Sequence, residues 1–179
     1  MSREHIDALW AIGADRVLWK WSPWPIASRD DMIQYVDKAL KEFLDRTSFP
    51  FVTVEIETGR VIGSTRFMNI NRQHRRVEIG CTWIGTSWHR TGLNREAKYL
   101  MLQAAFEDLQ FDRVEFKTDM LNDQSKTAIR RLGGVEEGVL RHHVVTRSGR
   151  VRDTIYFSIL RSEWAAVKRD LETQLGREG

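Results

Sequence analysis

The chain has 179 residues, of which 41% are hydrophobic and 30% charged, and this balance predicts one globular domain over residues 1–179. No apolar run approaches the roughly 18 residues that a membrane-spanning helix needs, and the N-terminal residues show no signal-peptide pattern. The single cysteine, Cys81, excludes an internal disulfide and predicts a reducing, cytoplasmic environment. A net charge of +3 with scattered basic residues argues against a nucleic-acid partner.

Helical spacing of apolar residues predicts a first helix over residues 4–14, and the Pro-containing segment "WKWSPWPIAS" (19–28) ends that pattern. Ser28 followed by Asp31 resembles a capping box and predicts the start of a second helix, which continues to Leu44. Three strands follow, "FVTVEI", "RVIGSTRFMNI" and "RRVEIGCTWIG", and the first two are joined by a turn at Glu57–Gly59. Strict alternation in the third strand would place Val77, Ile79, Cys81 and Trp83 on one face and Glu78, Gly80 and Thr82 on the other.

The second half of the chain predicts a helix over Arg95–Leu109, then the strand "RVEFKTD" and a short helix over 123–132. Asn122 is the expected N-cap of that short helix, and Gly133 is the expected left-handed residue after it. The strands "GVEEGVLRHHVV" and "VRDTIYFSIL" flank a turn at Ser148–Gly149, and Ser162 begins a last helix. This order predicts an α/β (α+β) fold with a mixed sheet.

The stretch "SWHRTGLNREA" (87–97) lies between a predicted strand and a predicted helix, a layout that can direct several backbone N–H groups at a phosphate. Gly92 allows a positive φ or a close approach of the backbone, and His89, Arg90 and Arg95 add side-chain donors. The stretch lacks the Gly-Lys-Ser/Thr of a Walker loop and the glycine spacing of a dinucleotide fingerprint. An anion site and an ordinary connecting loop both remain open from these residues alone.

From Val77 to Gly138 the sequence resembles the GNAT N-acetyltransferase superfamily, in its RimJ/RimL-type branch of ribosomal-protein N-terminal acetyltransferases. The acetyl-CoA loop of that superfamily, Q/R-x-x-G-x-G/A, matches His89-Arg90-Thr91-Gly92-Leu93-Asn94, with departures at His89 and Asn94. The following "REA", the segment "TDMLNDQSKTAIRRLGG" and the run "EEGVLR" match further markers of the branch in the expected order.

The resemblance implies a mixed, mostly antiparallel central sheet flanked by helices, acetyl-CoA as co-substrate, no metal, and transfer of an acetyl group to a primary amine. The acceptor would be a protein N-terminus or a small molecule, and a homodimer is one expected assembly. Family members usually begin with a strand, so either the true start lies upstream or the sheet lacks its first edge strand. The Tyr that protonates the leaving group in many members falls on Ile129, and the RimL-type base falls on Val144. A non-catalytic acyl-CoA-binding module is therefore the alternative.

The resemblance also implies roles for individual residues. Glu78 is the candidate general base, because it lies on the polar set of the strand that leads to the thioester, and Ser125 is the candidate partner of the leaving thiolate. The candidate cofactor-binding residues are Thr82, Trp83, Ile84, His89, Arg90, Thr91, Gly92, Leu93, Asn94, Arg95, Asn122 and Ser125. The candidate acceptor-binding residues are Trp24, Arg66, His142 and Tyr156.

Overall fold

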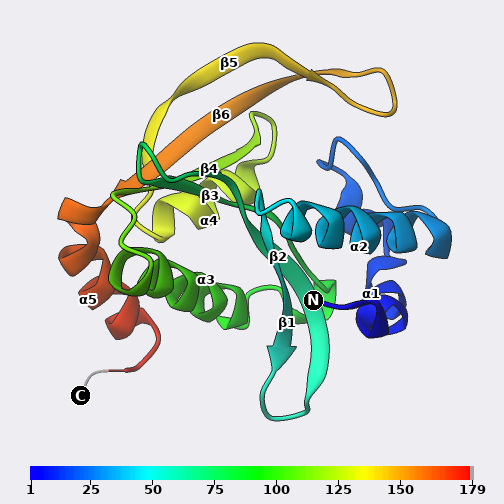
Figure 1. Cartoon of the computed structure of the whole chain (residues 1–179), viewed down its shortest axis with the longest axis horizontal. Helices are drawn as coiled ribbons and strands as arrows, with labels where there is room; N and C mark the ends of the chain where they lie inside the picture. Colours follow the sequence, from blue (N-terminus) through cyan, green and yellow to red (C-terminus); the bar gives the residue numbers. More distant parts are fainter. Residues whose placement is uncertain (178–179) are drawn as a thin grey trace.

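The computed structural model describes residues 1–177, and its elements follow the predicted chain order (Figure 1). The helices are α1 (Ile6–Gly13), α2 (Arg29–Leu44), α3 (Leu93–Gln103), α4 (Asp123–Arg131) and α5 (Trp164–Gln174). The strands are β1 (Phe49–Glu55), β2 (Arg60–Asn71), β3 (Arg76–Ile84), β4 (Arg113–Asp119), β5 (Val135–Val145) and β6 (Val151–Leu160).

Local signals in the sequence explain where two of the helices begin or end. The Ser28 hydroxyl accepts a hydrogen bond from the Asp31 amide, and the Asp31 carboxylate accepts one from the Ser28 amide, both at 3.1 Å. The Asn122 side-chain oxygen accepts a hydrogen bond from the Ser125 amide at 3.0 Å, which caps α4. Gly133 follows α4 with a φ of +90°, a conformation that favours glycine. These three predicted signals are confirmed.

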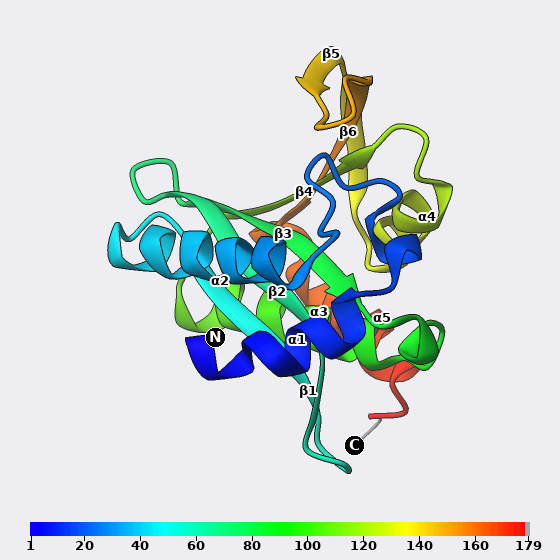
Figure 2. The same cartoon turned by 90° about the vertical axis from the view of Figure 1, so that its right-hand side faces the viewer.

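The strands form one six-stranded sheet in the order β1-β2-β3-β4-β6-β5. Every neighbouring pair is antiparallel except β3 and β4, which are parallel, so the predicted mixed and mostly antiparallel sheet is confirmed. The pairing of β3 with β4 covers only Arg76–Glu78 against Arg113–Glu115. Beyond Glu78 the two strands run apart (Figure 2). The centre of the sheet is therefore open toward the C-terminal ends of these strands.

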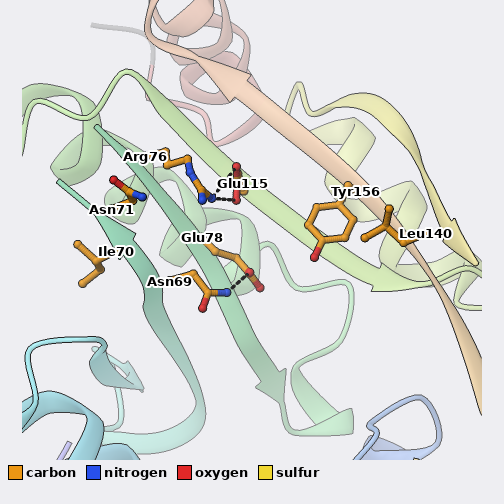
Figure 3. A pocket seen from close by; sticks show the side chains of 8 residues that line it. All are labelled: Asn69, Ile70, Asn71, Arg76, Glu78, Glu115, Leu140 and Tyr156. Atoms are coloured by element: carbon orange, nitrogen blue, oxygen red, sulfur yellow. Dashed lines mark hydrogen bonds and ion pairs between the residues drawn. The ribbon is translucent and has the colours of Figure 1, made fainter. Parts of the chain in front are cut away.

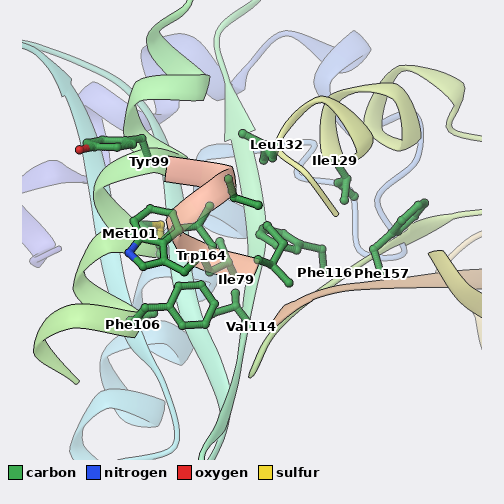
Figure 4. Packing of buried hydrophobic residues seen from close by; sticks show 14 of the residues in the cluster. Ile79, Tyr99, Met101, Phe106, Val114, Phe116, Ile129, Leu132, Phe157 and Trp164 are labelled. Atoms are coloured by element: carbon green, nitrogen blue, oxygen red, sulfur yellow. The ribbon is translucent and has the colours of Figure 1, made fainter. Parts of the chain in front are cut away.

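One face of the sheet is covered by α3, α4 and α5, which pack on it through the larger hydrophobic core (Figure 4). Phe106, in the π-helical turn η4 (Ala104–Asp108) after α3, packs against Trp164 of α5 with ring centroids 5.4 Å apart. Val77 and Ile79 of β3 face this core, and a buried side chain of such size contributes roughly 1.5–3 kcal/mol.

The opposite face is covered near its first strands by α1 and α2, which enclose a second hydrophobic core (Figure 2). Trp19, in the helical turn η2 (Arg16–Trp19), packs against Trp83 of β3 with ring centroids 5.2 Å apart. The indole nitrogen of Trp19 donates a hydrogen bond to the Gly13 carbonyl at 2.7 Å. Trp19 therefore anchors the segment after α1, and the rest of the Trp-rich segment continues from this fixed point.

The strict alternation predicted for the third strand is wrong beyond Gly80. Cys81 has a φ of +49°, and the pairing with β2 shifts register there, so two residues of β3 oppose the single residue Thr65. Such a bulge inserts one residue and exchanges the faces of all later side chains. Trp83 consequently joins the core beneath α2, whereas Thr82 bonds Thr65 at 2.8 Å on the opposite face.

Candidate active site

The divergence of β3 and β4 leaves backbone groups of β3 facing open space. Within residues 1–177, the residues of β3 after Glu78 have a strand neighbour only on the β2 side. Cys81 and Thr82 are exposed at this edge, although they lie near the middle of the sheet. An unpaired strand edge can pair with the amide groups of an extended ligand. The fold therefore offers a binding site for an extended molecule between these two strands.

The loop after β3 presents a group of backbone N–H donors at the start of α3. Gly92 is the N-cap of α3 with a φ of +91°, and the first amide bonded within the helix is that of Glu96, to the Gly92 carbonyl at 3.0 Å. In the described part of the chain, the amides of residues 90–95 have no recorded acceptor. The helix begins at Leu93, two residues before the predicted start at Arg95, because Gly92 adopts the capping conformation. The positive end of the helix dipole adds to the attraction for an anion.

The side chains of this loop are in part bonded to the protein itself. A ring nitrogen of His89 lies 3.0 Å from the Ile84 carbonyl oxygen, which ties the loop to the end of β3. Arg95 donates a hydrogen bond to the Gln174 carbonyl at 3.2 Å, which directs its guanidinium group toward the end of α5. The Thr91 hydroxyl donates to the Trp88 carbonyl at 2.8 Å. The donors that this loop could offer to an anion are consequently mainly those of the main chain and of the exposed Arg90.

Asn122 and Ser125 lie just after the C-terminal end of β4, on the other strand that borders the divergence. The Asn122 amide donates a hydrogen bond to the Asp119 carbonyl at 2.9 Å, which fixes the turn between β4 and α4. Because the Asn122 side chain caps the Ser125 amide, Ser125 lies in the first turn of α4. Its side chain is half-buried, and a hydroxyl in this position can donate a hydrogen bond to a group held between the strands.

Glu78 lies at the point where β3 and β4 part, and only 2% of its surface is exposed. The Asn69 side-chain amide donates a hydrogen bond to the Glu78 carboxylate at 2.7 Å, and the Lys117 ammonium lies 3.0 Å from the same oxygen. Burial alone would lower the pKa of Lys117, but the attraction and hydrogen bond of Glu78 outweigh it and hold that pKa above its ordinary value. Glu78 is therefore a buried carboxylate with a stable cationic neighbour.

A pocket of about 590 Å³ opens beside Glu78 on the face of the sheet that α3 does not cover (Figure 3). Glu78 lies between Asn69 of β2 and Tyr156 of β6 in this view. The centre of the Tyr156 ring lies 5.9 Å from the Lys117 ammonium. The ring of His143 in β5 packs edge-on against the Tyr156 ring, with centroids 6.0 Å apart. The pocket thus brings one of the predicted acceptor-binding residues, Tyr156, next to the predicted base.

His142 has a different environment from His143. It has a φ of +51° at an interruption of the β5–β6 pairing, and its amide donates to the Asp153 carboxylate at 2.7 Å. The residue that contacts Tyr156 is therefore His143, whereas the role of His142 in acceptor binding stays a prediction. Simple alternation could not tell the two apart, because the irregular backbone removes the regular period of the strand.

Trp24 lies in the loop of residues 20–27 between α1 and α2, and 62% of its surface is exposed. This loop is held against the β5–β6 hairpin, because the Arg147 amide donates to the Pro23 carbonyl at 2.9 Å. The Arg147 side chain also pairs with Asp31 at 3.0 Å. Figure 1 shows the loop rising toward the turn of the hairpin. An exposed indole beside the sheet is available to a ligand, as the prediction for Trp24 requires.

Arg66 is largely enclosed by the protein, with only 3% of its surface exposed. It forms an ion pair with Glu42 of α2 at 3.1 Å and stacks over the Tyr35 ring at 4.4 Å. Its guanidinium group therefore fastens α2 to the sheet, and its contact with an acceptor stays a prediction.

Tyr35 was not singled out from the sequence, yet its hydroxyl forms hydrogen bonds with the Ser64 hydroxyl at 3.1 Å and the Cys81 carbonyl at 3.4 Å.

Other polar side chains of this face could have been found from the sequence. Lys117 and Asp119 occupy alternate positions of "RVEFKTD", opposite to the buried apolar residues of the same strand. Arg152 and Thr154 alternate in the same way with the apolar residues of "VRDTIYFSIL".

In residues 1–177, no group of three or more His, Cys, Asp or Glu side chains is arranged to hold a metal ion. None of the helices in that range has the length and apolar character needed to cross a membrane.

Comparison with known proteins assigns this arrangement to a family. A family profile described as "Acetyltransferase (GNAT) domain" matches residues 1–135. The chain belongs to the GNAT acetyltransferase family. A solved GCN5-related N-acetyltransferase from Brucella melitensis superposes with a TM-score of 0.89 at 31% identity, covering 97% of this chain and 78% of that one. The open sheet centre and the loop before α3 are therefore features of a GNAT fold.

Two curated relatives agree with this assignment. The chain is 30% identical over 110 residues to "Putative ribosomal N-acetyltransferase YdaF" of Bacillus subtilis (strain 168), and this match covers 62% of the chain. The match spans 59% of the length of that relative. The chain is also 30% identical over 141 residues to "Uncharacterized N-acetyltransferase p20" of Bacillus licheniformis, and this match covers 78% of the chain and 76% of that protein. The likeness to YdaF supports the RimJ/RimL-like branch of the N-acetyltransferases.

Proposed function

We propose that this GNAT chain transfers an acetyl group from acetyl-CoA to a primary amine by direct attack of the amine on the thioester. The observation that carries the proposal is a pair of features on one strand. Beyond Glu78, β3 has a free edge, and at its end a loop presents the amides of residues 90–95. The acceptor in this proposal is a protein N-terminus or a small-molecule amine, and the name of YdaF, a putative ribosomal N-acetyltransferase, supports the first of these.

The free edge of β3 suits the amide-containing arm of acetyl-CoA, and the start of α3 suits its pyrophosphate. The arm would pair with the backbone of Thr82–Ile84, since these residues have no strand neighbour on the β4 side. The amides of residues 90–95 would bind the phosphate oxygens. The bulge at Cys81 leaves a residue out of the regular ladder, so a backbone amide there is available to the thioester carbonyl oxygen.

Glu78 is the residue that would take up the proton of the acceptor amine. An α-amine has an ordinary pKa near 8 and a lysine amine near 10.4, so either is mostly protonated at neutral pH and needs a base. The Lys117 ammonium at 3.0 Å and the Asn69 amide at 2.7 Å fix the position of the Glu78 carboxylate. Since Glu78 also lines the pocket beside the divergence, an amine bound there would lie near both the base and the thioester.

Ser125 is the residue that would donate a hydrogen bond to the departing thiolate of coenzyme A. It lies in the first turn of α4, and the backbone turn before it is fixed by Asn122. The N-terminus of α4 adds the positive end of a helix dipole, which stabilises a developing negative charge. Loss of the hydroxyl should therefore slow the step in which the carbon–sulfur bond breaks.

Glu78→Gln tests the proposal at the residue that it depends on most. The substitution retains the size and the hydrogen bond from Asn69 but removes the base, so kcat should fall about 10²–10⁴-fold while the Kd for acetyl-CoA stays within about threefold. Glu57→Gln, on the exposed β1–β2 turn, is the matched control and should retain full activity. An unchanged kcat in Glu78→Gln would exclude Glu78 as the base.

The second candidate function is a non-catalytic acyl-CoA-binding module. The pairing of one Glu78 carboxylate oxygen with both Asn69 and Lys117 favours it, because a buried carboxylate held in this way can serve structure alone. A module of this kind would be stabilised by acetyl-CoA in a thermal-shift assay but would release no coenzyme A with any amine, and Ser125→Ala would leave ligand binding unchanged. Release of coenzyme A that depends on Ser125 distinguishes the enzyme from the module.

A further inference from the structure

Two arginines at the start of β6, Arg150 just before the strand and Arg152 within it, share a single carboxylate. Arg150 and Arg152 both approach the same carboxylate oxygen of Asp119; for Arg152 the distance from Nε is 3.8 Å. The other oxygen of Asp119 accepts a hydrogen bond from the Leu121 amide at 3.0 Å. Asp153, the next acidic residue along β6, bonds the His142 amide instead. One positive charge of the pair therefore lacks a matching negative charge.

Two polar atoms in this region are buried without a partner among the described residues. The side chain of Arg152 is 9% exposed, and its Nε has no hydrogen-bond acceptor. Thr154 is fully buried, and its hydroxyl also lacks a partner. Residues 152 and 154 lie on the same face of β6, because they belong to the even-numbered set that alternates with Ile155 and Phe157, which point into the opposite core. Unsatisfied buried groups of this kind are rare and call for a ligand or another explanation.

The surroundings of the two arginines resemble a binding site rather than a surface ion pair. The guanidinium group of Arg150 lies 5.9 Å from the Trp21 ring, so the loop of residues 20–27 covers part of Arg150. Burial lowers the pKa of Arg152 despite the attraction of Asp119, which means that its charge is under-compensated. Arg150 remains 37% exposed, which leaves an approach from solvent.

The register of β4 and β6 relates the arginine pair to Glu78, the proposed base. Lys117, the partner of Glu78, is opposite Tyr156 in the β4–β6 register, and Asp119 is opposite Thr154. Arg152 lies four residues from Tyr156 along the strand, which corresponds to about 14 Å of backbone at roughly 3.4 Å per residue. An anion bound here would lie several bonds away from an amine held beside Glu78.

We propose that the acceptor carries an anionic group, several bonds from its reacting amine, that binds between Arg150 and Arg152. The inference rests on the proposed acetyl transfer and adds the class of acceptor to it. The anion would complete the charge balance of the arginine pair and supply an acceptor to Arg152 Nε. Trp24, which is exposed on the covering loop, would contact the part of the acceptor between its two ends. Two sources share this chemistry, an acidic side chain near a peptide N-terminus and a small amine with a distal carboxylate.

The test uses matched acceptors on the unmodified protein. One arm compares short peptides that have Asp or Glu at the second or third position with the same peptides carrying Asn or Gln. The other arm compares small ω-amino acids with their amides. We expect kcat/KM to be about tenfold or more higher for the acids in at least one arm, because a charge-assisted hydrogen bond to arginine is lost in the amide. Calorimetric binding of the same pairs in the presence of coenzyme A measures the preference independently of turnover.

The variant Arg152→Gln then identifies the residue responsible. It leaves Asp119 paired with Arg150, and it should reduce the preference for acids to less than about threefold while the Kd for acetyl-CoA stays within about threefold. Arg169→Gln, on the exposed face of α5, is the control and should retain the preference. Equal binding and equal kcat/KM for acids and amides in both arms would overturn the inference. Absence of turnover with a clear binding preference would contradict only the proposed transfer.

Discussion

Gly92 is the residue on which the geometry of the proposed cofactor-binding loop before α3 depends most directly. Its φ of +91° lies in the left-handed region, and a Cβ built on it would have no neighbouring atom within 4 Å. A substitution there is therefore opposed by backbone conformation and not by crowding. In the left-handed region a residue other than glycine costs roughly 1–2 kcal/mol, less for Asn and more for a β-branched residue.

Gly92→Val should accordingly weaken acetyl-CoA binding by about tenfold or more, because the loop would have to leave the conformation that gathers its amides. Gly92→Asn, which adds a side chain that tolerates this conformation, is the matched control and should bind within about threefold of the unmodified protein. Calorimetric titration with acetyl-CoA measures both values. Equal affinities for all three proteins would mean that the loop does not bind the cofactor.

Lys98 is a buried lysine on the face of α3 that packs on the sheet. Its ammonium donates hydrogen bonds to Thr65 at 2.7 Å and Thr82 at 2.5 Å, and burial lowers its pKa to about 7. In the unfolded chain the pKa is near 10.4, so between about pH 7 and 10.4 the unfolded state binds more protons and stability rises with pH. The cost of burying Lys98 is therefore greatest below about pH 7.

Lys98→Met should stabilise the protein by about 1–4 kcal/mol at pH 6, and this gain should shrink as the pH rises toward 10. Thr65 and Thr82 retain a hydrogen bond to each other at 2.8 Å, so the substitution leaves both hydroxyls partnered. Thermal unfolding at several pH values measures the effect, with the exposed Lys38→Met as the control. A gain that is the same at pH 6 and pH 10 would contradict the lowered pKa.

At the scale of elements, the loop of residues 20–27 and the β5–β6 hairpin are joined through Asp31 at the start of α2. The Asp31 carboxylate accepts hydrogen bonds from the Ala27 and Ser28 amides and pairs with Arg147. The bond from the Ala27 amide, followed by that from Arg147, lowers the pKa of Asp31. The contribution of Asp31 to stability is thus present above its ordinary pKa near 3.9 and is lost as the pH falls through its lower folded value.

Asp31→Asn should loosen the loop from the hairpin and raise KM for the acceptor by roughly 2–10-fold, while the Kd for acetyl-CoA stays unchanged, because the proposed cofactor site lies at β3 and α3. Asp37→Asn removes a comparable ion pair with Arg3, at 2.7 Å, from the same helix away from the hairpin, and it should leave KM unaltered. Steady-state kinetics with the acceptor varied at saturating acetyl-CoA measures the difference. An equal effect of both variants would show that the loop contact has no particular part in acceptor binding.

The elements that could be predicted from the sequence are those with local signals. The caps at Ser28 and Asn122 and the glycine at 133 act within a few residues, and each is confirmed. The bulge at Cys81 could not be predicted, because it depends on how β3 pairs with β2. In the same way, the burial of Arg66 against Glu42 results from the packing of α2 on the sheet, which no pattern near residue 66 reveals.

At the scale of the whole molecule, the prediction of one domain can be tested by unfolding. The two hydrophobic cores share β3, which contributes Ile79 to one and Trp83 to the other. Since neither core can lose its strand without disturbing the second, we expect a single cooperative transition in urea. Tryptophan fluorescence reports on Trp83 and Trp164 in the two cores, and its midpoint should coincide with that of far-UV circular dichroism. Separate midpoints would indicate two independently stable units.

We propose that the chain binds acetyl-CoA and transfers its acetyl group to an amine. Three features support this proposal together: the open sheet centre, the amide-lined loop and the buried Glu78. Release of free coenzyme A, followed with a thiol reagent, measures this directly across N-terminal peptides, amino acids, polyamines and other primary amines. We expect slow release of coenzyme A with acetyl-CoA alone and a much faster release with at least one amine. This acceleration should be lost in Glu78→Gln. Tight binding of acetyl-CoA without acceleration by any amine would contradict it.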